Sequence, residues 1–113
     1  MRWILLAVGL ALIGAAPARA DGIQSGEQLL ANCQSNKPKE TWSCRDYVSG
    51  ALDAIYTIQS MTFVCTFIPP AGFSEDQAEG VVLDYLKSHP DERSKSGAYN
   101  VGAALTAAYP CPK

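Results

Sequence analysis

The sequence predicts an all-α fold, a small four-helix bundle stapled by two disulfides. Three observations lead to this prediction. Apolar residues recur at three- and four-residue spacing in several segments, serines stand where helices would begin, and four cysteines lie near the expected helix ends. The chain has 113 residues, of which 48% are apolar, and this length fits one domain.

The first twenty residues have the features of a secretory signal peptide. Arg2 supplies a positive charge, and residues 3–14 form an uncharged apolar run. That run is too short to span a bilayer comfortably, which takes about 20 residues. Residues 18–20 read Ala-Arg-Ala, the small-x-small pattern that signal peptidase recognises, so we expect cleavage before Asp21. Residues 21–113 would then be an exported domain with no membrane insertion after cleavage; an uncleaved anchor is the alternative.

The charge of this expected mature domain excludes several kinds of partner. Without Arg2 and Arg19, eleven acidic residues stand against seven basic ones, which gives a formal charge of −4. An acidic domain does not favour nucleic acid or an anionic membrane surface. It is better suited to a basic protein partner.

Each expected helix has a serine before it and a stop signal after it. In chain order the expected helices are 26–34 after Ser25, 44–62 after Ser43, a third from Ser74 with Gln77 in a capping box, and a fourth from Ser94 or Ser96. The third should end at His89-Pro90 and the fourth at Pro110. Apolar positions cover more than half the circumference of 44–62, which predicts that it is the central helix.

The cysteines predict two disulfides, since an even number in an exported chain favours pairing. A metal site is not expected, because no C-x₂-C spacing occurs and the chain has a single histidine. Cys33 would end the first helix where Cys44 begins the second. Cys65 follows the second helix, and Cys111 follows the fourth, which returns to that end if the helices alternate in direction. We therefore predict Cys33–Cys44 and Cys65–Cys111.

Patterns typical of catalysis are missing from the sequence. It contains no nucleophile elbow and no glycine-rich phosphate loop, and its cysteines are committed to disulfides. His89, before Pro90, is most simply explained as a helix stop whose side chain interacts favourably with the negative end of the helix dipole. We therefore predict a binding protein that is not an enzyme and needs no cofactor.

Two loops are candidate contact surfaces. Residues 66–73 carry Phe67, Ile68 and Phe73, which either pack over the end of the bundle or form an exposed patch. Residues 89–96 are rich in charge and form either a solvated turn or a loop that enters a partner's cleft. We predict that this turn is the contact, with polar anchors at Asp91, Glu92 and Arg93 and core support from Tyr85.

The order of several short motifs resembles the Rap/Tai immunity proteins. The motifs are Cys33; Cys44-x-x-Tyr47-Val48-x-Gly50-Ala51-x-Asp53-Ala54; Phe63-x-Cys65; Val82-x-x-Tyr85-Leu86-x-x-His89-Pro90; and Ala103-Ala104-Leu105-x-x-Ala108-Tyr109-Pro110-Cys111. The resemblance spans nearly the whole of 21–113. It implies a periplasmic helical protein, often a homodimer, associated with type VI secretion. Characterised relatives bind and block a peptidoglycan amidase toxin.

A second resemblance is confined to residues 37–47, which include the loop before the second helix and the first turn of that helix. Lys37-Pro38-x-x-x-Trp42-Ser43-Cys44-Arg45-Asp46-Tyr47 is similar to the periplasmic acid-stress chaperones of the HdeA type. Those proteins are also small, helical and disulfide-bonded, but they have two cysteines. This resemblance implies the alternative function, a chaperone that opens at low pH and binds clients through apolar surface.

Overall fold

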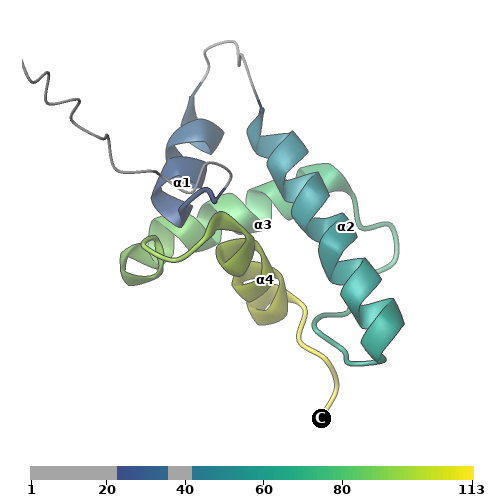
Figure 1. Cartoon of the computed structure of the whole chain (residues 1–113). Helices are drawn as coiled ribbons and strands as arrows, with labels where there is room; N and C mark the ends of the chain where they lie inside the picture. Colours follow the sequence, from purple (N-terminus) through teal and green to yellow (C-terminus); the bar gives the residue numbers. More distant parts are fainter. Residues whose placement is uncertain (1–22, 36–41) are drawn as a thin grey trace, which may run out of the picture.

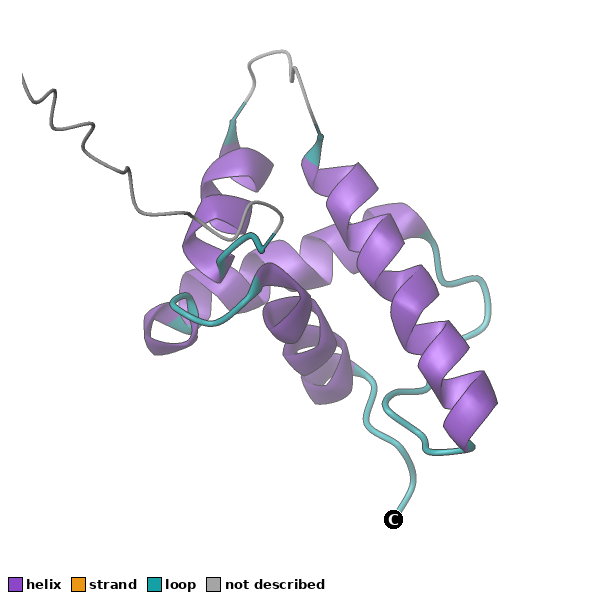
Figure 2. Cartoon of the chain, viewed as in Figure 1, coloured by secondary structure: helices purple, strands orange, loops and turns teal. Residues whose placement is uncertain are grey.

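The computed structural model describes residues 23–35 and 42–113, and within them the regular elements are all helical (Figure 2). The chain therefore has the predicted all-α, four-helix architecture, with a short 3₁₀ helix added before the last helix. The elements in order are α1 (Gly26–Gln34), α2 (Cys44–Thr62), α3 (Glu75–Ser88), η1 (Pro90–Glu92) and α4 (Gly97–Ala108).

Serine side chains begin all four α-helices. The hydroxyl of each serine accepts a hydrogen bond from a backbone N–H three residues along, one of the groups that a helix leaves unpaired at its start. In α1, α2 and α3 the side chain of the third helical residue accepts a hydrogen bond from the backbone N–H of the serine, which completes a capping box. The predicted caps Ser25, Ser43 and Ser74 are confirmed, and Ser96 rather than Ser94 caps α4.

The core lies where α3 crosses behind the other helices (Figure 1). The buried apolar side chains come from each of the four α-helices and from the loop after α2. They are Leu29, Leu30, Cys44, Val48, Leu52, Phe67, Ala78, Val82, Leu86, Val101, Ala104 and Leu105. Nine of these twelve residues are Val, Leu or Phe, and full burial of each such side chain contributes about 1.5–3 kcal/mol.

Both predicted disulfides are present. Cys33 and Cys44 join the end of α1 to the start of α2, with their Cα atoms 4.7 Å apart. Cys65 and Cys111 join the loop after α2 to the segment after α4, with Cα atoms 6.2 Å apart. The two links therefore fasten opposite ends of α2 to the rest of the fold (Figure 1).

The prediction that α2 is the central helix is wrong. Val48 and Leu52 in its first half are buried, but Ile58 is 56% exposed and Met61 is 75% exposed. The side chains of Ile58 and Met61, near the end of α2, are therefore exposed rather than buried against a neighbouring helix. Periodicity reports which way residues face around a helix, and it does not report how far along the helix a neighbour extends.

Among the helices of the described part of the chain, none combines the length and the apolar character needed to cross a bilayer.

Candidate partner-binding site

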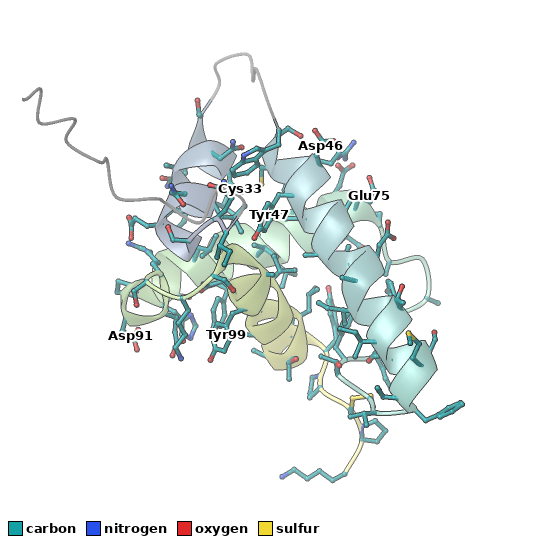
Figure 3. All side chains as sticks on the ribbon, in the orientation of Figure 1. Cys33, Asp46, Tyr47, Glu75, Asp91 and Tyr99 are labelled. Carbon is teal, nitrogen blue, oxygen red and sulfur yellow. A yellow bond between two sulfur atoms is a disulfide. The ribbon has the colours of Figure 1, made fainter. Side chains whose placement is uncertain are left out.

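The turn between α3 and α4, residues 89–96, forms one corner of the molecule. Asp91 is exposed at the outer edge of this turn (Figure 3). Its carboxylate makes no side-chain hydrogen bond or ion pair with the residues that the structure describes. Asp91 is therefore the predicted anchor that is fully available to a partner.

Arg93, a second predicted anchor, is occupied within the fold. Its Nε donates a hydrogen bond to the carbonyl oxygen of Leu86 at 2.6 Å, and its Nη2 donates to that of Lys87 at 3.1 Å. These carbonyls belong to the last turn of α3, where helices have no intrahelical donors left. The guanidinium thus caps α3, and a cation at this end also suits the helix dipole.

Glu92, the third predicted anchor, is paired with Lys95. Its Oε2 lies 2.7 Å from the Lys95 Nζ, and the glutamate side chain is only 23% exposed. The ammonium also donates to the Tyr99 hydroxyl at 3.1 Å and lies 4.3 Å from the centre of that ring. The Glu92 carboxylate and the Tyr99 hydroxyl together raise the pKa of Lys95. This side-chain cluster braces the turn against the first residues of α4.

Backbone bonds attach the same turn to the start of α1. The N–H of Gly26 donates to the Lys95 carbonyl at 2.8 Å, and that of Glu27 donates to the Arg93 carbonyl at 2.9 Å. In return, the Gly97 N–H donates to the Gln24 carbonyl at 2.6 Å. The free donors at the start of one helix thus satisfy carbonyls of the turn. The sequence contains no pattern that signals these contacts.

Beside the turn, Tyr85 and His89 form an aromatic pair. Their rings stack with centres 3.9 Å apart and an interplanar angle of 15°. Burial, with a smaller contribution from the charge of Glu92, raises the pKa of the Tyr85 hydroxyl. The pair lines an open groove between α3 and α4, together with Val81, Asp84, Ser88, Ala104, Ala107 and Ala108. His89 is also the C-cap of α3, whose last helical residue is Ser88, so the helix ends before Pro90 as the sequence predicts.

The second candidate loop divides into a packed part and an exposed part. Phe67 is 1% exposed and packs edge-on to Phe73, which is half-buried. Gln59, at the end of α2, accepts hydrogen bonds from the N–H groups of Thr66 and Phe67. Phe67 and Phe73 therefore cover the end of the bundle, as one of the two interpretations of this loop expected, whereas Ile68 is 52% exposed.

An exposed apolar tip adjoins this loop, and we define it as Met61, Phe63, Val64 and Ile68. Phe63 is 93% exposed and Val64 is 64% exposed, and sequence reasoning missed both. They follow the last turn of α2, where the chain turns through Phe63 in the left-handed region at φ 57°. Isolated surface apolars are ordinary, but a cluster of this kind marks a surface suited to contact.

Within residues 23–35 and 42–113, no cluster of three or more His, Cys, Asp or Glu side chains is arranged to hold a metal ion. The candidate functional features of the described chain are therefore surfaces: the charged turn with its groove, and the apolar tip.

Comparison with known proteins assigns the family. The family model of the Rap1a immunity proteins matches residues 25–111. The chain belongs to the Rap1a immunity protein family. The match runs from the serine that caps α1 to the last cysteine, so it includes both disulfides and the 89–96 turn. No curated protein and no solved structure matches the chain significantly. Membership in the Rap1a family gives the chain an immunity-type function, which consists of binding a protein toxin.

Proposed function

We propose that the chain is a periplasmic immunity protein, associated with type VI secretion, that binds a peptidoglycan amidase toxin and occludes its active site. The observation that carries the proposal is the 89–96 turn, which presents Asp91 outward while its backbone is held by α1. An occluding protein needs such a turn, because a segment that enters a cleft loses less entropy when it is already ordered.

The charge of the chain supports the same proposal. The sequence has a formal net charge of −2, and the expected mature part is more acidic still. An acidic surface attracts a basic hydrolase and speeds the encounter between the two. In the proposed complex Asp91 pairs with a cationic group at the toxin's cleft, while Glu92 and Arg93 hold the turn and contact the toxin through their exposed parts.

The proposed location is the periplasm. The expected signal peptide, residues 1–20, lies outside the described residues, so the location is inferred from the disulfides and the family. Disulfides form and persist in oxidising compartments such as the bacterial periplasm. A homodimer is also part of the proposal, and the apolar tip is a surface that a second copy would bury.

The family match favours this function over the acid-stress chaperone alternative. The resemblance to HdeA-type proteins ends at Tyr47, within the first turn of α2, whereas the Rap1a match continues to Cys111. The chaperone function would require clients to be protected at about pH 2–3, below the reference pKa values of carboxyl groups.

The decisive experiment pairs this chain with any secreted amidase that is encoded beside its gene. Cells that export the amidase to their periplasm should survive when they also produce this chain, and the purified chain should block cleavage of peptidoglycan. Asp91→Arg should weaken binding, and Asp53→Arg serves as a control with the same charge change on an exposed part of α2. Equal weakening by both variants would show a net-charge effect and contradict the assigned contact. Failure of the unmodified chain to bind or protect would overturn the function.

A further inference from the structure

Asn100, in α4, is the one fully buried polar residue in the described part of the chain, with an exposed fraction of 0%. Its Nδ2 donates toward three backbone carbonyls: that of Glu92 at 3.0 Å, that of Lys95 at 3.4 Å and that of Ser96 at 2.9 Å. A buried amide costs free energy unless it is hydrogen-bonded, so these bonds offset the cost of burying the Nδ2, whereas the buried Oδ1 has no hydrogen-bond partner among the described residues. Glu92, Lys95 and Ser96 all belong to the 89–96 turn.

Gly26 closes the other side of this arrangement. A β-carbon at Gly26 would lie 2.5 Å from the Asn100 Nδ2, so the backbone of α1 approaches the amide as only glycine allows. The Gly26 N–H also donates to the Lys95 carbonyl that Asn100 reaches. One buried side chain thus joins the start of α1, the inside of the turn and the first turn of α4.

We infer that Asn100 is a positioning residue for partner binding, which holds the 89–96 turn in its outward conformation before a partner arrives. The inference depends on the proposed function, because it assigns the turn to the partner contact. Asn100 does not touch the partner and acts through the backbone that carries Asp91. Arg93 fastens one end of the turn to α3, whereas Asn100 crosses its interior and fixes the carbonyls of Glu92 and Lys95 relative to each other.

The physical consequence is a population effect. Without the Asn100 amide, the turn gains alternative conformations, and the fraction in the binding-competent conformation falls. The apparent dissociation constant rises by the inverse of that fraction. Ordering even one or two residues on binding weakens affinity by about tenfold to a hundredfold. The loss of affinity should come from slower association, because the contacts in the formed complex, and with them the dissociation rate, are unchanged.

A first test needs no partner. Trypsin cleaves after Arg93 and Lys95 inside the turn, and Arg45 and Lys87 in α2 and α3 serve as internal references. We expect Asn100→Leu and the milder Asn100→Ser to speed cleavage at Arg93 and Lys95 about tenfold or more, with the helices retained by circular dichroism. Asn32→Leu is the matched control, since Asn32 also donates its amide to a backbone carbonyl, that of Trp42, at the other end of α1. Unchanged cleavage in both Asn100 variants, or equal acceleration at all four sites, would overturn the inference.

A second test measures association and dissociation rates with any secreted amidase that is encoded beside the gene. Asn100→Ser should bind about tenfold more weakly through slower association, and Asn32→Leu should bind normally. Wild-type rates in Asn100→Ser, or a loss confined to dissociation, would contradict the positioning role. If the unmodified chain binds no amidase, the proposed function fails, and the cleavage pattern still decides whether Asn100 holds the turn.

Discussion

The first residue of α4, Gly97, lies directly against the ring of Tyr47 in α2. A β-carbon at Gly97 would stand 2.7 Å from the Tyr47 hydroxyl oxygen and 2.9 Å from two of its ring carbons. The contact is part of the core, and burial raises the pKa of Tyr47. Because Gly97 has no side chain, the start of α4, which follows the charged turn, can pack directly against Tyr47 of α2.

Gly97→Ala should destabilise the fold. The added methyl group meets a ring rather than the flexible end of a side chain, and overpacking of this kind typically costs about 1–3 kcal/mol. Chemical denaturation at neutral pH would measure the change in the free energy of unfolding. Gly50→Ala in α2 is the control, because nothing lies within 4 Å of its β-carbon and alanine favours a helix by about 1 kcal/mol. A neutral Gly97→Ala would contradict the close approach.

Local rules predict the helices and disulfides well because the deciding groups are close in sequence. Ser43 and Asp46 form a capping box three residues apart, and Pro110 ends the last helix wherever that helix packs. The pairing of Cys65 with Cys111 spans 46 residues, but it follows from the alternation of helix directions. In each case one short segment, or the order of the segments, carries the information.

The organisation of the candidate site is largely invisible to the same rules. Asn100 has the sequence features of an exposed helical residue, and only the fold shows it inside the turn. The sequence predicts Arg93 only as a partner contact, and the structure shows that it also caps α3 through carbonyls six and seven residues earlier. Gln59 resembles a residue of the polar helix face, and it binds the following loop instead. Side-chain bonds to the backbone leave no periodic pattern in a sequence.

Arg93→Ala should cost about 1–2 kcal/mol of stability, because it leaves two carbonyls of α3 without their charged donor. An ordinary surface substitution stays within about 0.5 kcal/mol, which we expect for Asp91→Ala. Arg45→Ala is an informative comparison, since Arg45 pairs with Asp76 and Glu79 while half-exposed. Exposed ion pairs contribute about 0–1 kcal/mol to stability. Arg45→Ala should therefore lower the melting temperature less than Arg93→Ala does. The reverse order would show that Arg93 does not cap α3.

Phe63→Gly should stabilise the fold despite removing an aromatic ring. Phe63 has φ 57° and is 93% exposed, so it pays the cost of a left-handed conformation and gains little from packing. Glycine is the usual residue after a helix in this conformation, and we expect a gain of about 0.5–1 kcal/mol. Thermal unfolding of Phe63→Gly would measure this gain in stability, and Phe63→Ala is the comparison variant. If alanine stabilises as much as glycine, removal of exposed apolar surface rather than relief of the backbone is the cause.

Removal of the two disulfides should have unequal effects. Cys65–Cys111 closes a loop with a sequence separation of 46, and Cys33–Cys44 closes one with a separation of 11. A longer closed loop removes more entropy from the unfolded chain, so the loop-closure relation gives about 4 kcal/mol for the first link and about 3 kcal/mol for the second. The Cys65→Ser, Cys111→Ser pair should therefore unfold at a lower denaturant concentration than the Cys33→Ser, Cys44→Ser pair.

Denaturation of the two double variants beside the intact protein measures both losses directly. The slope of the unfolding transition with denaturant should rise in each variant, because a chain without the cross-link exposes more surface when it unfolds. The larger loss should fall on the variant that frees the segment after α4 from the loop after α2. A larger loss from the Cys33–Cys44 pair would show that native packing at the α1–α2 end, rather than the length of the closed loop, sets the stabilisation.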